Sequence, residues 1–118
     1  MKVVQLTAHG TPGQFKLNEL PDPEPAPDEV IVQVGACGLN HLDLWLEEGA
    51  LPIPIELPRV PGCEIAGRIE TVGAQATEWR TGERVAVQSN LYCGHCEFCL
   101  KGEESLCLHG ELLGVQRD

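Results

Sequence analysis

The sequence predicts a mainly β protein: a small, partly open β-barrel with one or two short helices and a metal-binding lobe. Three observations lead to this fold class. Short apolar stretches alternate with polar residues, glycine and proline separate them at short intervals, and only one stretch has helical spacing. With 42% apolar residues, the chain can form the core of one domain spanning residues 1–118.

The first two strands are expected near the amino terminus. Residues 1–8 are mostly apolar and precede a turn rich in glycine and proline, and residues 14–20 form a second short strand. Residues 21–27 hold alternating prolines, which cannot donate hydrogen bonds to a sheet. This segment is therefore expected to be an extended connector.

The clearest strand spans residues 28–36, where valines recur at every second position and share one face. A short helix should follow, because Asn40 can cap its start, Gly49 can end it, and apolar residues between them recur at helical spacing. This is the only stretch to which the sequence assigns a helix.

The next segment, residues 51–61, contains four prolines and is expected to be an extended loop. Further strands are expected at residues 68–73 and 84–88, with a turn at 80–83. No glycine-rich G-x-G-x-x-G motif follows a strand. A Rossmann nucleotide-binding unit is therefore not expected within these residues.

Four cysteines in the segment 91–110 have the spacing C-x2-C-x2-C-x7-C. They are Cys93, Cys96, Cys99 and Cys107. The segment has no clear hydrophobic pattern, but four thiolates can fix it by tetrahedral coordination of one zinc ion. We therefore predict a structural zinc lobe. His95 and His109 are additional donors, and ligation by four sulfurs is the simplest choice.

Two disulfides or an iron-sulfur cluster are the alternatives for these cysteines. Disulfides fit a secreted chain, whereas this sequence shows no apolar stretch long enough for a signal core or a membrane helix. We therefore expect the reducing cytoplasm, which favours a metal. The bacterial ferredoxin motif ends in x3-Cys-Pro, whereas here seven residues precede Cys107 and Leu108 follows it.

The charge balance excludes some partners. Eighteen acidic and eight basic residues give a net charge of −10. Such a surface repels phosphate backbones, and no cluster of lysine or arginine offsets the repulsion. Neither nucleic acid nor a membrane is expected as a partner.

The two remaining cysteines, Cys37 and Cys63, each lie in a turn flanked by glycine after an extended segment. One interpretation is a pair of small buried hydrophobic residues. The other is an open metal site, in which the carboxylate of Glu64 lies beside Cys63. Two thiolates would be an incomplete ligand set for zinc.

Read together, these motifs resemble one family over essentially the whole chain: the N-terminal, GroES-like catalytic domain of zinc-containing medium-chain alcohol dehydrogenases. The cysteine spacing of the lobe is that of the family. The family signature G-H-E-x2-G-x5-G is matched with cysteine in place of histidine, by Gly62, Cys63, Glu64, Gly67 and Gly73.

The resemblance implies a GroES-like fold and a second, catalytic zinc bound by Cys37 and Cys63, with Glu64 as a nearby or alternating ligand. The third fixed ligand lies, in the family, beyond residue 118. Full-length relatives interconvert alcohols and aldehydes with NAD or NADP, which a Rossmann domain of about 150 residues binds. That domain is not expected within this chain.

Three departures from the family pattern bear on catalysis. Cys63 would add a thiolate and make zinc a poorer Lewis acid. Leu39 and Leu42 occupy positions where many relatives place a hydroxyl and a histidine that relay a proton, so that either His41 would have to substitute or the chemistry would have to differ. Residues 40–45 are also similar to the quinone-reductase-like members.

Three functions follow from the resemblance. The first is the catalytic-domain portion of an alcohol dehydrogenase-like oxidoreductase, inactive by itself. The second is a zinc-stabilised GroES-like assembly or binding domain without catalysis, and the third is a quinone or enone reductase module. A truncated barrel leaves unpaired strand edges, and we therefore expect a homodimer or larger assembly.

Overall fold

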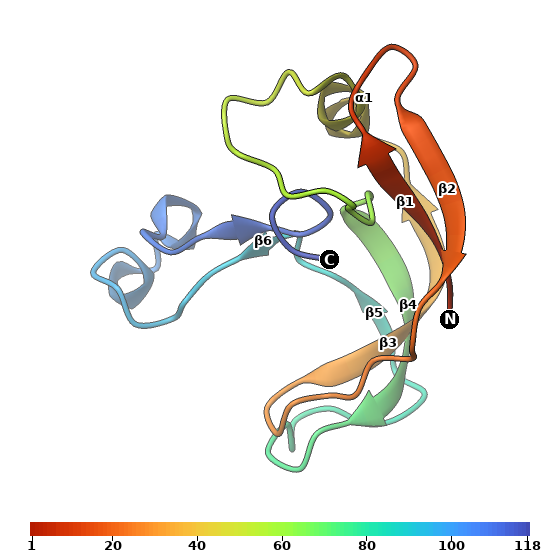
Figure 1. Ribbon diagram of the computed structural model, residues 1–118. Coiled ribbons are helices and arrows are strands. Elements are labelled where there is room, and N and C mark those ends of the chain that lie inside the picture. Colours follow the sequence, from red (N-terminus) through yellow and green to blue (C-terminus); the bar gives the residue numbers. More distant parts are fainter.

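The computed structural model describes residues 1–118 and confirms a mainly β fold in which open sheets form a GroES-like partial barrel (Figure 1). The strands are β1 (Lys2–Ala8), β2 (Gln14–Glu19), β3 (Val30–Gly38), β4 (Glu64–Val72), β5 (Arg84–Ala86), β6 (Asn90–Leu91) and β7 (Glu111–Leu112). One α-helix, α1 (His41–Glu48), and two 3-10 turns, η1 (Cys99–Lys101) and η2 (Glu104–Leu106), complete the chain.

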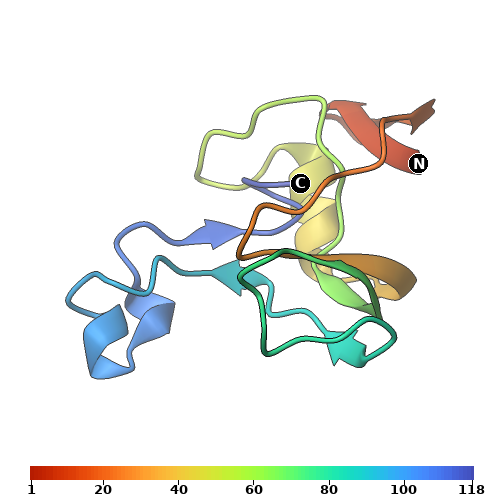
Figure 2. The same ribbon diagram turned by 90° about the horizontal axis from the view of Figure 1, so that it is seen from below.

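The strands form three separate antiparallel sheets. Strands β1 and β2 make a hairpin, β3, β4 and β5 make a three-stranded sheet, and β6 pairs with β7. The β6–β7 pair carries the cysteine lobe, which projects away from the two larger sheets (Figures 1 and 2). The lobe therefore stands apart from most of the apolar packing.

Helix α1 has the bounds that the sequence predicts. The Asn40 side chain accepts a hydrogen bond of 3.0 Å from the Leu42 N–H, and the Asn40 N–H donates one of 2.8 Å to the Asp43 carboxylate. This reciprocal pair is a capping box. Gly49 ends the helix with φ +76°, a left-handed conformation that glycine adopts without strain.

The apolar core is small. Leu6, Leu46 and Val115 form the buried cluster, and only 11 of 118 residues are buried in total. The radius of gyration, 15.4 Å, exceeds the value of about 13.5 Å for a compact domain of this length. Both observations agree with a barrel that is not closed.

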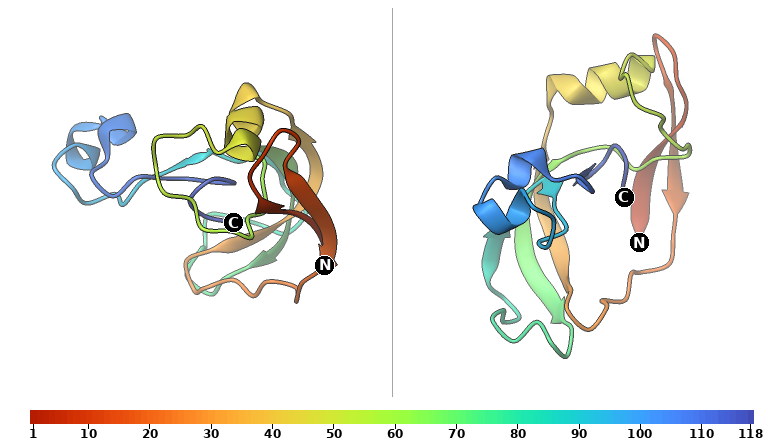
Figure 3. Two further views of the ribbon diagram at one scale, coloured as in Figure 1. Left: turned by 45° about the horizontal axis from the view of Figure 1, so that its top comes forward. Right: turned by 90° about the vertical axis from the view of Figure 1, so that its left-hand side faces the viewer.

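The carboxy-terminal turn is tied to the barrel near this core. The Arg59 guanidinium, which is largely buried, forms an ion pair of 2.9 Å with the Asp118 carboxylate. Arg59 also exchanges two backbone hydrogen bonds with Leu6 in β1. The C-terminus accordingly lies at the centre of the molecule (Figure 3).

The predicted bounds of β3, β4 and β5 are wrong, and β3 begins at Val30 instead of residue 28. Strand β3 continues through Cys37, which pairs with Ile65, and β4 begins at Glu64 instead of residue 68. Strand β5 ends at Ala86 instead of residue 88. Two register shifts between β3 and β4 let the strands pair over nine residues each, and this pairing overrides the glycines that suggested turns.

Candidate metal centres

The four lobe cysteines converge. Their Sγ atoms all lie within 4.8 Å of one another. The Sγ–Sγ distances are 3.5 Å for Cys96 and Cys99, 3.6 Å for Cys93 and Cys107, and 3.9 Å for Cys96 and Cys107. Four sulfurs at about 2.3 Å from a tetrahedral zinc would be about 3.8 Å apart. The spacing of the sulfurs therefore fits a tetrathiolate zinc site.

Backbone N–H groups lower the pKa of two of these thiols. The N–H groups of Cys93 and His109 lie 3.3 and 3.4 Å from Cys107 Sγ and lower the pKa of this thiol. The Cys99 N–H lowers the pKa of Cys96 to about 6, whereas burial raises the pKa of Cys99 to about 12. The protein alone therefore does not stabilise the thiolate of Cys99, whereas a bound divalent cation would.

The other two cysteines lie at the end of the sheet where β3 ends and β4 begins. Cys37 lies in β3, Cys63 directly precedes β4, and the register aligns Gly38 with Glu64. A Cβ atom on Gly62 would lie 2.7 Å from Cys37 Sγ, and the φ of Gly62 is +106°. The Cys37 thiol therefore lies directly against a backbone position that requires glycine.

Glu64 is held by the residue that caps the helix. Its Oε1 atom accepts a hydrogen bond of 2.6 Å from Asn40 Nδ2. Sequence reasoning assigned Asn40 only to capping and therefore missed this link. The residues are 24 positions apart, and only the pairing of β3 with β4 brings them together.

The two thiols of this second cluster differ. Cys63 is buried, with 6% of its surface exposed, and Cys37 is exposed. Burial raises the pKa of the Cys63 thiol, and the negative charges of Asp43 and Glu64 raise it further. This environment stabilises the neutral thiol of Cys63, not a thiolate.

Apolar hollows flank Cys37. One of about 560 Å³ lies between β1 and β3, and one of about 460 Å³ lies toward α1. His41 lines neither hollow and instead contacts Trp45 edge-on, with ring centres 5.0 Å apart. Of the four predicted catalytic residues, only Cys37 lines these hollows. Cys63 and Glu64 lie at the start of β4, and His41 lies at the start of α1.

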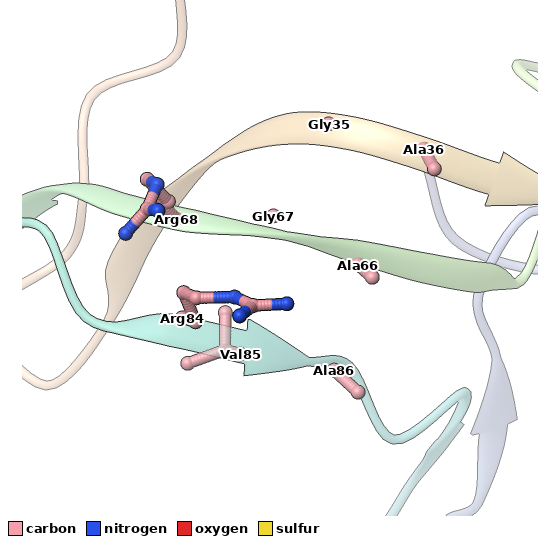
Figure 4. A pocket seen from close by; sticks show the side chains of 8 residues that line it. All are labelled: Gly35, Ala36, Ala66, Gly67, Arg68, Arg84, Val85 and Ala86. Atoms are coloured by element: carbon pink, nitrogen blue, oxygen red, sulfur yellow. The ribbon is translucent and has the colours of Figure 1, made fainter.

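A separate groove crosses β3, β4 and β5 (Figure 4). Small residues and Val85 line it, with Arg68 and Arg84 paired opposite each other on β4 and β5. It contains no cysteine, histidine or carboxylate. The groove is thus distinct from both cysteine clusters.

The lobe is the only place where the chain gathers a set of metal ligands. No second group of three or more cysteine, histidine, aspartate or glutamate side chains is close enough to hold an ion. Cys37, Cys63 and Glu64 therefore do not make a closed site within residues 1–118.

The profile of the alcohol dehydrogenase GroES-like domain matches residues 26–116. The chain belongs to this family. It is 41% identical over 111 residues to an alcohol dehydrogenase of Schizosaccharomyces pombe, a match that covers 93% of the chain and 32% of the relative. The chain thus spans about a third of the length of such relatives.

Solved structures agree with this membership. A NAD-dependent alcohol dehydrogenase superposes with a TM-score of 0.93 at 38% identity, covering 99% of this chain and 34% of that one. A cobalt- and zinc-bound thermostable alcohol dehydrogenase from Pyrobaculum aerophilum superposes with a TM-score of 0.89 at 33% identity, covering 100% of this chain and 36% of that one.

No helix of the structure has the length and apolar character needed to span a membrane.

Proposed function

We propose that residues 1–118 are the zinc-stabilised catalytic-domain portion of an alcohol dehydrogenase-like oxidoreductase. The observation that carries this proposal is the convergence of four cysteines within a chain whose family match spans residues 26–116. Zinc bound by these four thiolates would order the lobe, because apolar packing is sparse there. Small alcohols or carbonyl compounds are the proposed substrates of the whole enzyme, with NAD or NADP as coenzyme.

In this proposal Cys37 and Cys63 contribute two ligands of a catalytic zinc, and Glu64 is a nearby or alternating ligand. When bound, such a zinc would polarise a carbonyl or stabilise an alkoxide during hydride transfer. The protein's own contribution is positional. Strand pairing places Cys37 between two apolar hollows, and Asn40 orients the Glu64 carboxylate beside the pair.

By itself the 118-residue chain is proposed to be inactive. It contains no nucleotide-binding unit, and its second ligand set is incomplete. Assays with alcohols and aldehydes should show no oxidation or reduction with NAD(H) or NADP(H). Turnover by this chain would contradict the proposal.

A zinc-stabilised assembly domain without catalysis is the second candidate. The open ligand set and the environment that keeps Cys63 neutral favour it. Metal analysis after extensive dialysis separates the two candidates. Two zinc ions per chain, one lost in Cys37→Ser and the other in Cys93→Ser, would support a catalytic site, whereas one zinc lost only in Cys93→Ser would support the assembly domain.

Either function is compatible with a homodimer or larger assembly, which we propose on the basis of free strand edges. Strand β2 pairs only with β1 and exposes Phe15 and Leu17. Light scattering at micromolar concentration should give a multiple of 12.8 kDa. A monomer mass would contradict this assembly. Either function is also compatible with the cytoplasm, which we propose because a thiolate metal site needs reduced cysteines.

A further inference from the structure

Two histidines outside the tetrathiolate set lie side by side on the lobe. Each follows a lobe cysteine at the same interval, as Cys93-x-His95 and Cys107-x-His109. Because Cys93 Sγ and Cys107 Sγ are 3.6 Å apart, the two segments run close together. The imidazole rings stack with their centres 6.2 Å apart and their planes inclined by 23°.

A backbone hydrogen bond fixes the tautomer of one ring. The Nδ1 atom of His95 lies 2.7 Å from the Cys93 carbonyl oxygen. A carbonyl oxygen only accepts, so Nδ1 carries the hydrogen and Nε2 of the neutral ring keeps its lone pair. Histidines that bind metals commonly donate their other N–H to a carbonyl in this way.

We propose that His95 and His109 form a second, exchangeable divalent-metal site on the outside of the lobe. This site would bind a transition-metal ion that prefers imidazole ligands, such as Zn²⁺, Ni²⁺ or Cu²⁺. Two imidazoles bound to one zinc at 2.0–2.1 Å have their ring centres about 5 Å apart. Both side chains are exposed, so small rotations can shorten the observed separation by about 1 Å.

Such a site would differ from the tetrathiolate set in strength and accessibility. Two protein ligands leave the remaining positions to water, so the ion exchanges readily. The net charge of −10 raises the concentration of cations near the surface. The bound ion would join the turn after Cys93 to the turn after Cys107, and so would brace the lobe from outside.

The test uses Zn²⁺ added to the chain that already carries one equivalent of zinc, with the imidazole resonances of all four histidines followed by NMR. The resonances of His95 and His109 should shift together and saturate at one further equivalent. Replacing either by glutamine should weaken this binding about 100-fold, because a chelating pair becomes a single ligand. The matched control, His41→Gln, should leave it unchanged.

Several outcomes would overturn the proposal. His95 and His109 would respond at different zinc concentrations if each bound alone, and the single variants would then keep the wild-type affinity. A shift confined to His9 or His41 would place the added zinc outside the lobe instead. Metal analysis of each variant shows whether the first zinc is retained, and His109→Gln repeats the test if His95→Gln loses it.

Discussion

The two cysteine clusters of this chain differ in how their members are brought together. The four lobe cysteines lie within 15 consecutive positions, 93–107, and converge at distances that fit one zinc. Cys37 and Cys63 are 26 positions apart and lie at the same end of the β3–β4 pair only because these strands pair. The lobe site, whose ligands are close in sequence, is complete within residues 1–118. The ligand set of Cys37 and Cys63, which strand pairing assembles, is not.

Removing a lobe cysteine should have the largest effect. Structural zinc contributes about 10–16 kcal/mol in small zinc-binding peptides. Cys93→Ser should therefore lose the tightly bound zinc, and amide hydrogen exchange in residues 91–110 should accelerate strongly. In Cys37→Ser the lobe should keep both its zinc and its protection. Zinc retained at full occupancy in Cys93→Ser would show that the lobe does not need all four sulfurs.

The stability of the barrel should depend on apolar packing, whereas the order of the lobe should depend on bound metal. Leu46, 1% exposed, lies in the buried cluster, and Leu46→Ala should lower the free energy of unfolding by about 2–5 kcal/mol in urea titrations. Leu100, 75% exposed on the lobe, provides the control. Leu100→Ala should change stability by less than about 0.5 kcal/mol. Equal losses would mean that the lobe also packs against something in solution.

The contact between Gly62 and Cys37 can be tested by substitution with alanine. Gly62→Ala meets both a positive φ and the Cys37 sulfur, and should cost about 3 kcal/mol. Gly82 also has a positive φ, +90°, but a Cβ atom at this position would have no neighbour within 4 Å. Gly82→Ala should therefore cost only about 1–2 kcal/mol. Equal values in thermal unfolding would show that Cys37 moves away freely.

The smallest expected effect concerns the residue that joins the helix to the second cluster. Asn40→Ala removes the cap and should cost about 1 kcal/mol. Asn40→Ser keeps a capping oxygen but loses the hydrogen bond to Glu64, so it should retain most of the stability. If chemical denaturation shows the serine and alanine variants to be equally unstable, the bond to Glu64 carries the effect instead of the cap.

Secondary structure followed from the sequence wherever its cause is local. The bounds of α1 were predicted because Asn40 and Gly49 act on the adjacent backbone. The start of β4 was predicted four residues late, because pairing with β3 extends it to Glu64. The valines of β3 predicted a strand, but only the sheet determined that it includes Cys37.

The sequence by itself determined the mainly β class, the capped helix and the four cysteines of the lobe, because turn residues, caps and closely spaced ligands act over a few positions. Only the tertiary structure decided that Glu64 binds Asn40, that Arg59 pairs with Asp118, and that His95 stacks on His109. These contacts join residues 14 to 59 positions apart. Their partners are chosen by strand register and chain packing, which no short stretch of sequence encodes.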